Sequence, residues 1–423
     1  MWGDFLNIFK YCFDFSYKYF LSLIKWILLG TIVGAFSGVI GSVFHLSIDY
    51  ATGLRENNPF YLLLLPFAGL FIVGIYHKFK KKGNIDTNRV IESVESSKNV
   101  PLIMAPLIFI STVLTHLCGG SAGREGAALQ LGGSIGYNLG KLFKLNKNNL
   151  HIIVMCGMSG VFAALFGTPL TATVFALEVA TVGIIHYIGF LPCIISSIIA
   201  YIISLKFGIT PVHFENLAIT NLSAENLIKI TVLSLLCAIV SILFCITIKG
   251  FEKASKKIFP NSYIKAAVGG ILIIILTFLL KTHEYNGAGM DTVRAAINGI
   301  AKPEAFILKI IFTAITISAG FRGGEIVPAF FIGSTFGCVI GPLLGISAGF
   351  SAAIGFVSLF CGVVNCPLAS LILSVEVFGS EGLLFFAIAC AVSYMMSGCF
   401  GLYHSQRIVY SKINDELINI NTK

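Results

Sequence analysis

Apolar runs separated by short polar stretches make up most of this sequence. Eight runs have a length at or near that of a membrane span, at residues 20–46, 59–76, 102–117, 188–205, 227–248, 266–280, 307–319 and 383–396. A helix crosses the hydrocarbon core of a bilayer with about 20 apolar residues. The runs are continuous, whereas the strands of a membrane β-barrel alternate apolar and polar side chains. The pattern therefore predicts an all-α polytopic membrane protein.

Composition and charge agree with this prediction. The chain is 56% hydrophobic and 12% charged, against about 25% charged residues in soluble domains. Its net charge of +9 comes largely from lysines beside the apolar runs, which is typical of loops on the cytoplasmic side. These are Lys78, Lys80, Lys81, Lys82, Lys141, Lys144, Lys147, Lys253, Lys256 and Lys257. We expect a multi-pass protein of the cell membrane with both termini in the cytoplasm, and no nucleic-acid partner, because basic and aromatic residues are not interleaved.

Four motifs recur in the same order, which indicates an internal repeat. Copies that begin at Asp86, Ser121, Gly133 and Gly167 are matched by copies at Asp291, Ser318, Gly333 and Asn365, displaced by 197 to 205 residues. We expect an amphipathic segment at 1–17, a first membrane repeat at 18–206, a linker at 207–225, a second repeat at 226–413 and a short cytoplasmic tail at 414–423. Repeats of this kind commonly hold substrate at their interface. The spacing does not decide between parallel and inverted repeats.

Three glycine-rich polar stretches interrupt the apolar sequence, at 82–87, 119–126 and 320–328. Each precedes a helix-compatible run, so they predict discontinuous helices whose N-termini point at one site. A helix N-terminus offers unpaired N–H groups and a partial positive charge, and it binds anions without a full cation. The alternative is that the glycines only permit close helix packing. Buried acids in two of the three stretches favour the anion site. A soluble phosphate loop is disfavoured, because the Gly-Lys-Ser/Thr ending is missing.

At these stretches the chain resembles the CLC family of anion channels and anion/proton antiporters. The resemblance rests on the segments at 83–87, 123–130, 167–178 and 323–328, and on Tyr410 after the last run. It implies an inverted-repeat, homodimeric fold with one anion path per subunit. By the same resemblance, the residues around the anion would be Asn84, Ile85, Gly123, Arg124, Gly126, Gly324, Glu325, Ile326, Val327 and Tyr410.

Four departures from the family pattern make the chain most similar to its fluoride/proton antiporter branch. Asn84 replaces a serine, Ala127 replaces a proline, Glu325 replaces an apolar residue, and Val179 stands in place of an inner proton-relaying glutamate. The resemblance therefore implies export of fluoride in exchange for protons, with protons, fluoride or chloride, and membrane lipid as partners. A chloride or broad halide channel or exchanger of the same fold is the alternative.

Glu125 is the predicted gate that couples proton and anion movement. Its carboxylate can occupy the site formed by the helix N-termini, and protonation releases it. A salt bridge with Arg124 is the alternative, although adjacent residues on a helix do not face one another. Glu325 is a possible second acid for proton handling or fluoride binding, or else an acid stabilised by a helix dipole.

The other candidates also have two interpretations. Asn84 donates its amide to fluoride or forms a loop turn, and Tyr410 donates its hydroxyl or is an interfacial aromatic residue. Glu178 and Glu376 hold equivalent repeat positions, which favours a structural role such as capping for both.

The remaining chemistry is sparse. Eleven cysteines lie mostly within apolar runs and have no CxxC spacing, and the histidines are scattered. We therefore expect no metal site, no cofactor and no enzymatic activity, since no nucleophile–base pair is evident.

Overall fold

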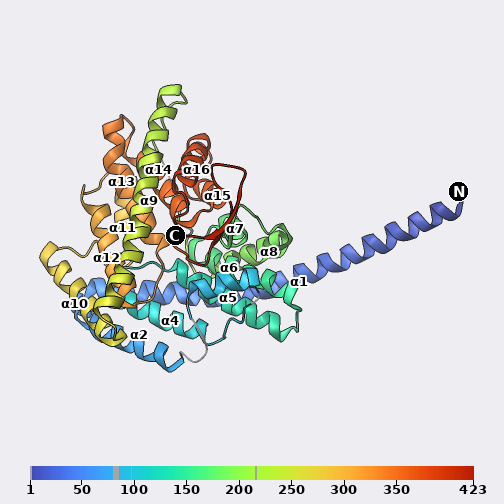
Figure 1. Ribbon diagram of the computed structural model, residues 1–423, viewed down its shortest axis with the longest axis horizontal. Coiled ribbons are helices and arrows are strands. Elements are labelled where there is room, and N and C mark those ends of the chain that lie inside the picture. The colour runs from blue at the N-terminus through green and yellow to red at the C-terminus, as the bar shows by residue number, and fades with distance from the viewer. Residues whose placement is uncertain (1, 80–84, 97, 215–216) are drawn as a thin grey trace.

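The structure is a computed structural model that describes residues 2–79, 85–96, 98–214 and 217–423. It is mostly helical (Figure 1). The first half contains α1 (Trp2–Asn57), α2 (Leu65–Phe79), α3 (Thr87–Ser96), α4 (Met104–Leu117), α5 (Glu125–Leu142), α6 (Lys147–Phe166), α7 (Pro169–Glu178) and α8 (Phe190–Lys206). The second half contains α9 (Ala224–Ile258), α10 (Ser262–Leu280), α11 (Met290–Ile297), α12 (Ala305–Ala319), α13 (Ile326–Ile340), α14 (Ala348–Val364), α15 (Pro367–Phe378) and α16 (Leu383–Met396).

The helices confirm the predicted polytopic all-α fold. All eight apolar runs lie on helical segments, and within the described residues seven helices are long and apolar enough to cross a membrane. In the part of the chain that the structure describes, three short 3₁₀ segments connect or extend helices: Pro59–Leu64, Tyr187–Gly189 and Gly341–Leu344.

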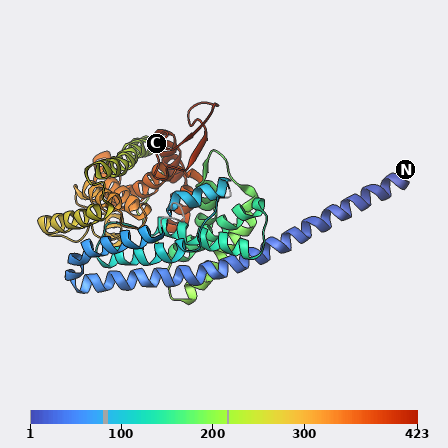
Figure 2. The same ribbon diagram turned by 60° about the horizontal axis from the view of Figure 1, so that its bottom comes forward.

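Helix α1 lies along the other helices over its C-terminal part and projects from the molecule at its N-terminal part (Figure 1, Figure 2). Its 56 residues, at about 1.5 Å each, make it about 84 Å long, more than twice the hydrocarbon core of a bilayer. The helix continues without interruption past residue 17. The predicted boundary between a surface segment and the first membrane repeat therefore has no break in the backbone.

Each half has two buried helices in direct backbone contact, α5 with α6 and α13 with α14. A Cβ atom added to Gly157 would collide with the Gly132 carbonyl, and one added to Gly355 would collide with the Gly333 carbonyl. Small residues allow helices inside a membrane to approach this closely. The same close packing recurs in both halves, at the helices α5 and α13 that follow the second and third glycine-rich stretches.

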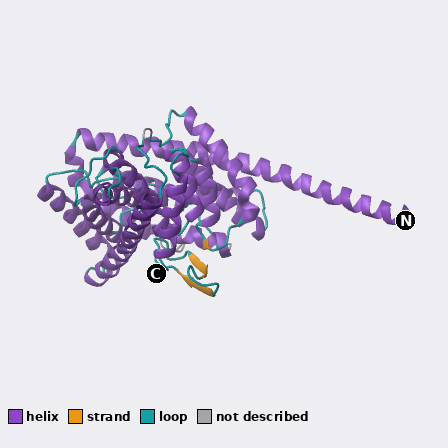
Figure 3. Cartoon of the chain, turned by 90° about the horizontal axis from the view of Figure 1, so that it is seen from above, coloured by secondary structure: helices purple, strands orange, loops and turns teal. Residues whose placement is uncertain are grey.

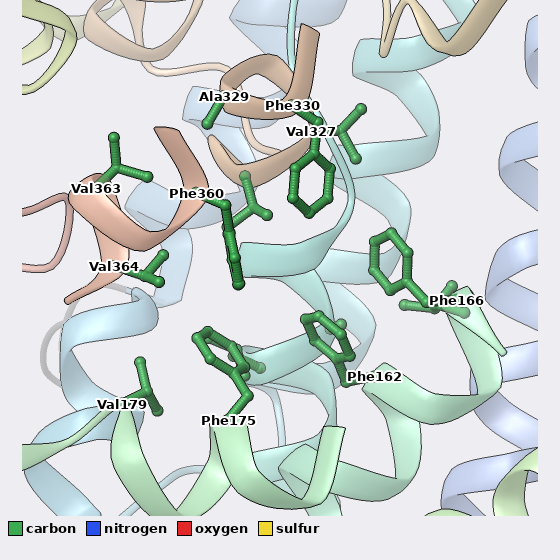
Figure 4. Packing of buried hydrophobic residues seen from close by; sticks show 14 of the residues in the cluster. Phe162, Phe166, Phe175, Val179, Val327, Ala329, Phe330, Phe360, Val363 and Val364 are labelled. Atoms are coloured by element: carbon green, nitrogen blue, oxygen red, sulfur yellow. The ribbon is translucent and has the colours of Figure 1, made fainter. Parts of the chain in front are cut away.

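A column of phenylalanine rings joins the two halves (Figure 4). Phe162 of α6 lies 5.2 Å from Phe175 of α7, measured between ring centroids, and Phe175 lies 5.8 Å from Phe360 of α14. Phe360 in turn lies 5.2 Å from Phe330 of α13. Tilted aromatic pairs at these separations add favourable contacts beyond their buried area. The column therefore fixes α6 and α7 against the two buried helices of the other half.

The chain ends in a small sheet beside the helices (Figure 3). Strand β2 (Arg407–Tyr410) pairs in parallel with β1 (Thr181–Val182) and antiparallel with β3 (Leu417–Asn421). Thr422, just beyond β3, donates its hydroxyl to the Tyr403 carbonyl at 2.6 Å. Half of the predicted tail at 414–423 is thus a strand, and this strand is tied to the membrane part of the chain.

Glu178 and Glu376 cap each other's helices. Glu178 closes α7 and accepts hydrogen bonds from the backbone N–H groups of Leu368 and Ala369, at the start of α15 (3.3 and 3.0 Å). Glu376 of α15 accepts the N–H groups of Leu170 and Thr171, at the start of α7 (2.9 and 2.8 Å). Each carboxylate thus binds the positive end of the other helix's dipole. This geometry supports the structural role expected for both acids.

Removing one cap tests this role. We expect Glu178→Ala to lower the free energy of unfolding by about 2–4 kcal/mol, because two buried N–H groups lose a charged acceptor. The measurement is unfolding of the purified protein in detergent. The control is Glu381→Ala, at an exposed position next to α15, which should change stability by no more than about 0.5 kcal/mol. Equal stability of the two variants would contradict the capping role.

Candidate functional site

Two glycines join the broken segments of the two halves. Gly123 and Gly324 form an isolated antiparallel bridge, in which the N–H of each residue donates to the carbonyl of the other (2.6 and 2.7 Å). A Cβ atom on Gly324 would lie 2.6 Å from the Gly126 nitrogen and 2.8 Å from the Glu125 nitrogen. Only glycine permits this approach. The bridge brings the N-terminus of α5 beside the N-terminus of α13.

Glu125 is the first residue of α5, and its carboxylate binds backbone N–H groups from both helix N-termini. Its Oε2 atom accepts the N–H of Arg124 at 3.0 Å and that of Val327, in the first turn of α13, at 3.1 Å. The side chain is fully buried, and no described residue hydrogen-bonds to its other oxygen, Oε1. The carboxylate thus sits where N–H groups and helix dipoles converge, which is an environment suited to an anion.

The Arg124 side chain turns away from Glu125. Its guanidinium lies 3.3 Å from the Asp49 carboxylate of α1 and stacks 5.7 Å from the centroid of the Phe166 ring. Arg124 therefore contacts Glu125 through its backbone N–H and forms no salt bridge with it. This geometry removes the alternative interpretation of Glu125 as half of an Arg–Glu ion pair.

Glu325 is the second acid at the bridge. It occupies the N-cap position of α13, yet its side chain makes no capping hydrogen bond there. A Cβ atom added to Gly126 would lie 3.5 Å from the Glu325 Oε2 atom, so the carboxyl faces the first turn of α5. Glu325 and Glu125 are close enough to repel each other when both are charged. Ile326, which begins α13, is buried beside them.

The first glycine-rich stretch approaches the same place. Thr87, at the start of α3, donates its hydroxyl to the Gly126 carbonyl at 3.4 Å and accepts a hydrogen bond from Gln130 at 2.9 Å. Ile85 is buried. Asn84, the predicted fluoride ligand, lies outside the described residues.

Two cavities flank the bridge, and an arginine lines each. Arg124 lines a cavity of about 530 Å³ whose wall includes residues 283–294, beyond the C-terminal end of α10. Arg322, which stacks 4.2 Å from the Tyr76 ring centroid, lines a cavity of about 320 Å³ whose wall includes Ser262 and Lys265, at the N-terminal end of α10. The 19 residues of α10 span about 28 Å, so the cavities open toward opposite ends of the molecule.

Residues 68–398 match the sequence profile of a family described as voltage-gated chloride channel, which is more than half of the chain. The chain belongs to this CLC family. Its two repeats are inverted: the broken helices of the first and second half place their arginines at opposite mouths.

Individual CLC relatives agree over nearly the whole length. A chloride/fluoride channel protein of Pseudomonas syringae pv. tomato is 34% identical over 92% of this chain and 87% of its own. An H⁺/Cl⁻ exchange transporter of Vibrio parahaemolyticus is 23% identical over 83% of this chain and 81% of its own. A solved CLC-type fluoride/proton antiporter superposes with a TM-score of 0.88 at 31% identity, covering 92% of this chain and 99% of the other.

The structure does not place Tyr410 at this CLC site. Tyr410 is 44% exposed on β2, where it pairs with Leu417 of β3. Tyr403 is buried instead, no described residue hydrogen-bonds to its hydroxyl, and both Glu125 and Glu325 are near enough to act on it electrostatically. Both tyrosines follow the last apolar run, and Tyr403 is the nearer one. The sequence signal for Tyr403 was its position close after the last apolar run. We therefore take Tyr403, in place of Tyr410, as the candidate hydroxyl of the site.

Val179 is buried at the end of α7, with its carbonyl accepting a hydrogen bond from Gln406 at 2.9 Å. An apolar residue therefore occupies the position that the resemblance assigns to an inner proton acceptor (Figure 4). Among the described residues, Glu325 is the acid that lies beside Glu125.

Substitution of a bridge glycine tests the geometry. We expect Gly324→Ala to abolish ion transport and to lower the melting temperature, because its methyl group would collide with the backbone of α5. Gly250→Ala is the matched control, since a Cβ atom at this position of α9 meets nothing within 4 Å. Alanine favours a helix by about 1 kcal/mol over glycine, so the control should be as stable as the parent or more so. Normal transport by Gly324→Ala would exclude the bridge as a required feature.

Proposed function

We propose that this protein is a secondary-active antiporter that exports fluoride in exchange for protons. The observation that carries the proposal is the position of the Glu125 carboxylate among backbone N–H groups of α5 and α13. A negative side chain in an anion site competes with the transported anion. When a proton neutralises the carboxyl group, its attraction to the helix N-termini falls and the site becomes free for the anion. One residue thus links proton uptake to anion passage.

The site residues divide between backbone and side chain. Gly123, Arg124, Gly126, Ile326 and Val327 shape the site through their backbones. Glu325 and Tyr403 supply side-chain groups, and Asn84 remains the ligand that the sequence resemblance implies. Fluoride is small and strongly hydrated, so strong hydrogen-bond donors must replace the water it loses. A protonated Glu325 and the Tyr403 hydroxyl are donors of this kind, and their presence favours fluoride.

The wider setting follows from the family and from the charge pattern. The chain is a multi-pass membrane protein. Lys253, Lys256 and Lys257 end α9, just before the N-terminal end of α10 that lines the cavity of Arg322. By the positive-inside rule we assign this end, with both termini, to the cytoplasm of a cell membrane. By likeness to CLC relatives we propose a homodimer with one anion path in each subunit, and a transporter rather than an enzyme.

Chloride is the second candidate substrate. Chloride or Cl⁻/H⁺ exchange is named for several relatives, including the Vibrio parahaemolyticus protein. Two positions favour fluoride over this alternative. Glu325 adds an acid where the family pattern has an apolar residue, and Val179 stands where that pattern has an inner proton-relaying glutamate.

Transport by the purified protein in liposomes tests the proposal. We expect fluoride efflux to exceed chloride efflux and to be accompanied by proton uptake. Glu125→Gln and Glu125→Ala should abolish the proton movement while the protein stays folded. Equal fluoride and chloride rates would instead support a broad halide transporter, and fluoride flux without protons would support a channel. Proton movement that persists in both variants would exclude Glu125 as the gate.

Glu325 is tested separately. We expect Glu325→Ala to slow fluoride transport about tenfold or more, because one hydrogen bond to a charged group contributes about 1.5–3 kcal/mol. Glu325→Gln, which keeps an N–H donor, should retain more activity than Glu325→Ala. The initial rate of fluoride efflux is the measurement, and Glu416→Ala in the exposed β2–β3 hairpin is the control. A fluoride rate equal to that of the parent in Glu325→Ala would exclude its participation.

A further inference from the structure

The cavity beside Arg124 collects histidines from separate parts of the chain. His45 of α1, His116 of α4, His213 of the segment before α9 and His283 of the segment after α10 line it, which is half of the eight histidines in the sequence. Histidine is the side chain whose unperturbed charge changes between about pH 5 and 8. The charged residues that also face this cavity are Asp49, Arg55, Glu56, Arg124, Glu284, Asp291 and Arg294.

Most of these charges have simple ion partners. Glu284 pairs with Lys302 at 2.8 Å, Asp291 pairs with Arg294 at 2.9 Å, and Glu56 lies 3.5 Å from Arg55. Asp49 differs, because its carboxylate contacts both a histidine and an arginine. Its Oδ2 atom lies 2.8 Å from the His45 Nε2 atom, and its Oδ1 atom lies 3.3 Å from the Arg124 guanidinium.

The His45–Asp49 pair lies between the open cavity and Arg124, the residue that precedes Glu125. The Asp49 side chain is 55% exposed, while those of His45 and Arg124 are 11% and 12% exposed. Arg124 then donates its backbone N–H to Glu125. A continuous series of contacts therefore runs from an open carboxylate to the buried acid. Four acids, three arginines and four histidines face this cavity, whereas the other cavity is lined by Arg322, Lys265, Asp86 and one histidine, His77.

We propose that this cavity is the outer proton-collecting site of the antiporter, with His45 and Asp49 as its relay to Glu125. The inference rests on the proton coupling proposed above. A hydronium ion or a protonated buffer molecule gives its proton to the His45–Asp49 pair, whose net charge rises by one. The pair then releases this proton to water in the cavity and regains its former charge. The Glu125 carboxylate takes up the proton when its side chain turns toward that water, and it becomes a neutral carboxylic acid. Free protons are scarce near neutral pH, so a buffering pair at the mouth speeds their capture.

The test compares dilute with concentrated buffer, because mobile buffer can replace a proton relay. The variants are His45→Gln and Asp49→Asn in the full chain in liposomes, with fluoride-driven proton uptake as the readout. In dilute, weakly buffered solution near neutral pH we expect both initial rates to fall severalfold below that of the parent. Concentrated imidazole buffer should restore them, and the ratio of protons to fluoride should stay unchanged throughout.

Two controls exclude a structural explanation. His151→Gln, in the first turns of α6 and away from this cavity, should behave as the parent in both buffers. Asp49→Glu keeps the carboxylate and should retain most of the rate in dilute buffer. A defect in Asp49→Asn that imidazole does not relieve would mean that Asp49 only positions Arg124, and would overturn the proposal.

Parental rates of His45→Gln and Asp49→Asn in dilute buffer would also overturn it, leaving proton coupling itself intact. If the parent moves fluoride without protons, the proposed antiport fails first and this inference fails with it.

Discussion

The Gly123–Gly324 bridge is the contact on which the rest of the site depends. Two helices that begin inside a membrane each leave unpaired N–H groups, and burying such groups without partners costs several kcal/mol. The bridge satisfies one N–H and one carbonyl from each broken segment and holds the two N-termini together. Two further N–H groups, those of Arg124 and Val327, share one acceptor, the Glu125 carboxylate. These N–H groups need a hydrogen-bond acceptor. When the carboxylate leaves the site, a mobile anion can therefore bind to them.

Backbone N–H groups are a suitable ligand for this exchange. A full positive charge in the site would bind an anion tightly and release it slowly, whereas transport needs both entry and exit. Here the two nearby arginines direct their guanidinium groups elsewhere, Arg124 to Asp49 and Phe166, and Arg322 to Tyr76. Backbone N–H groups therefore make the direct contacts to the carboxylate, and the arginine charges act on it only from a distance. A proton that neutralises the carboxylate weakens these contacts and leaves the N–H groups free for a halide.

The sequence predicted the parts of this arrangement that have local signals. Glycines and acids inside apolar runs revealed the broken helices and Glu125, because such residues are unfavourable in a lipid-facing helix. The recurrence of Pro and Glu at constant spacing revealed the repeat, and with it a structural role for Glu178 and Glu376. The sequence did not indicate which N–H groups the two acids bind, because each acid caps a helix about 200 residues away in the chain.

Other features depended on tertiary structure alone. Tyr410 was predicted to supply the hydroxyl at the site, whereas the structure exposes Tyr410 on β2 and buries Tyr403. Helices α7 and α15, with 10 and 12 residues, are too short to be recognised as spans and are stabilised by their mutual caps. The i, i+4 spacing of His45 and Asp49 is visible in the sequence, but their meeting with Arg124 requires α1 to lie beside the start of α5.

The two inverted repeats give the protein two cavities with similar backbone geometry. The side chains that line the two cavities differ. Arg124 and Arg322 mark equivalent places, each stacked on an aromatic ring at the edge of a cavity. Around Arg322 the wall adds Lys265, Asp86 and one histidine, and around Arg124 it adds four acids, two further arginines and four histidines. A protein that takes an anion from one side and a proton from the other needs this asymmetry. The backbone of the repeats sets where Glu125 can bind, and the side chains at each mouth set which ion arrives there first.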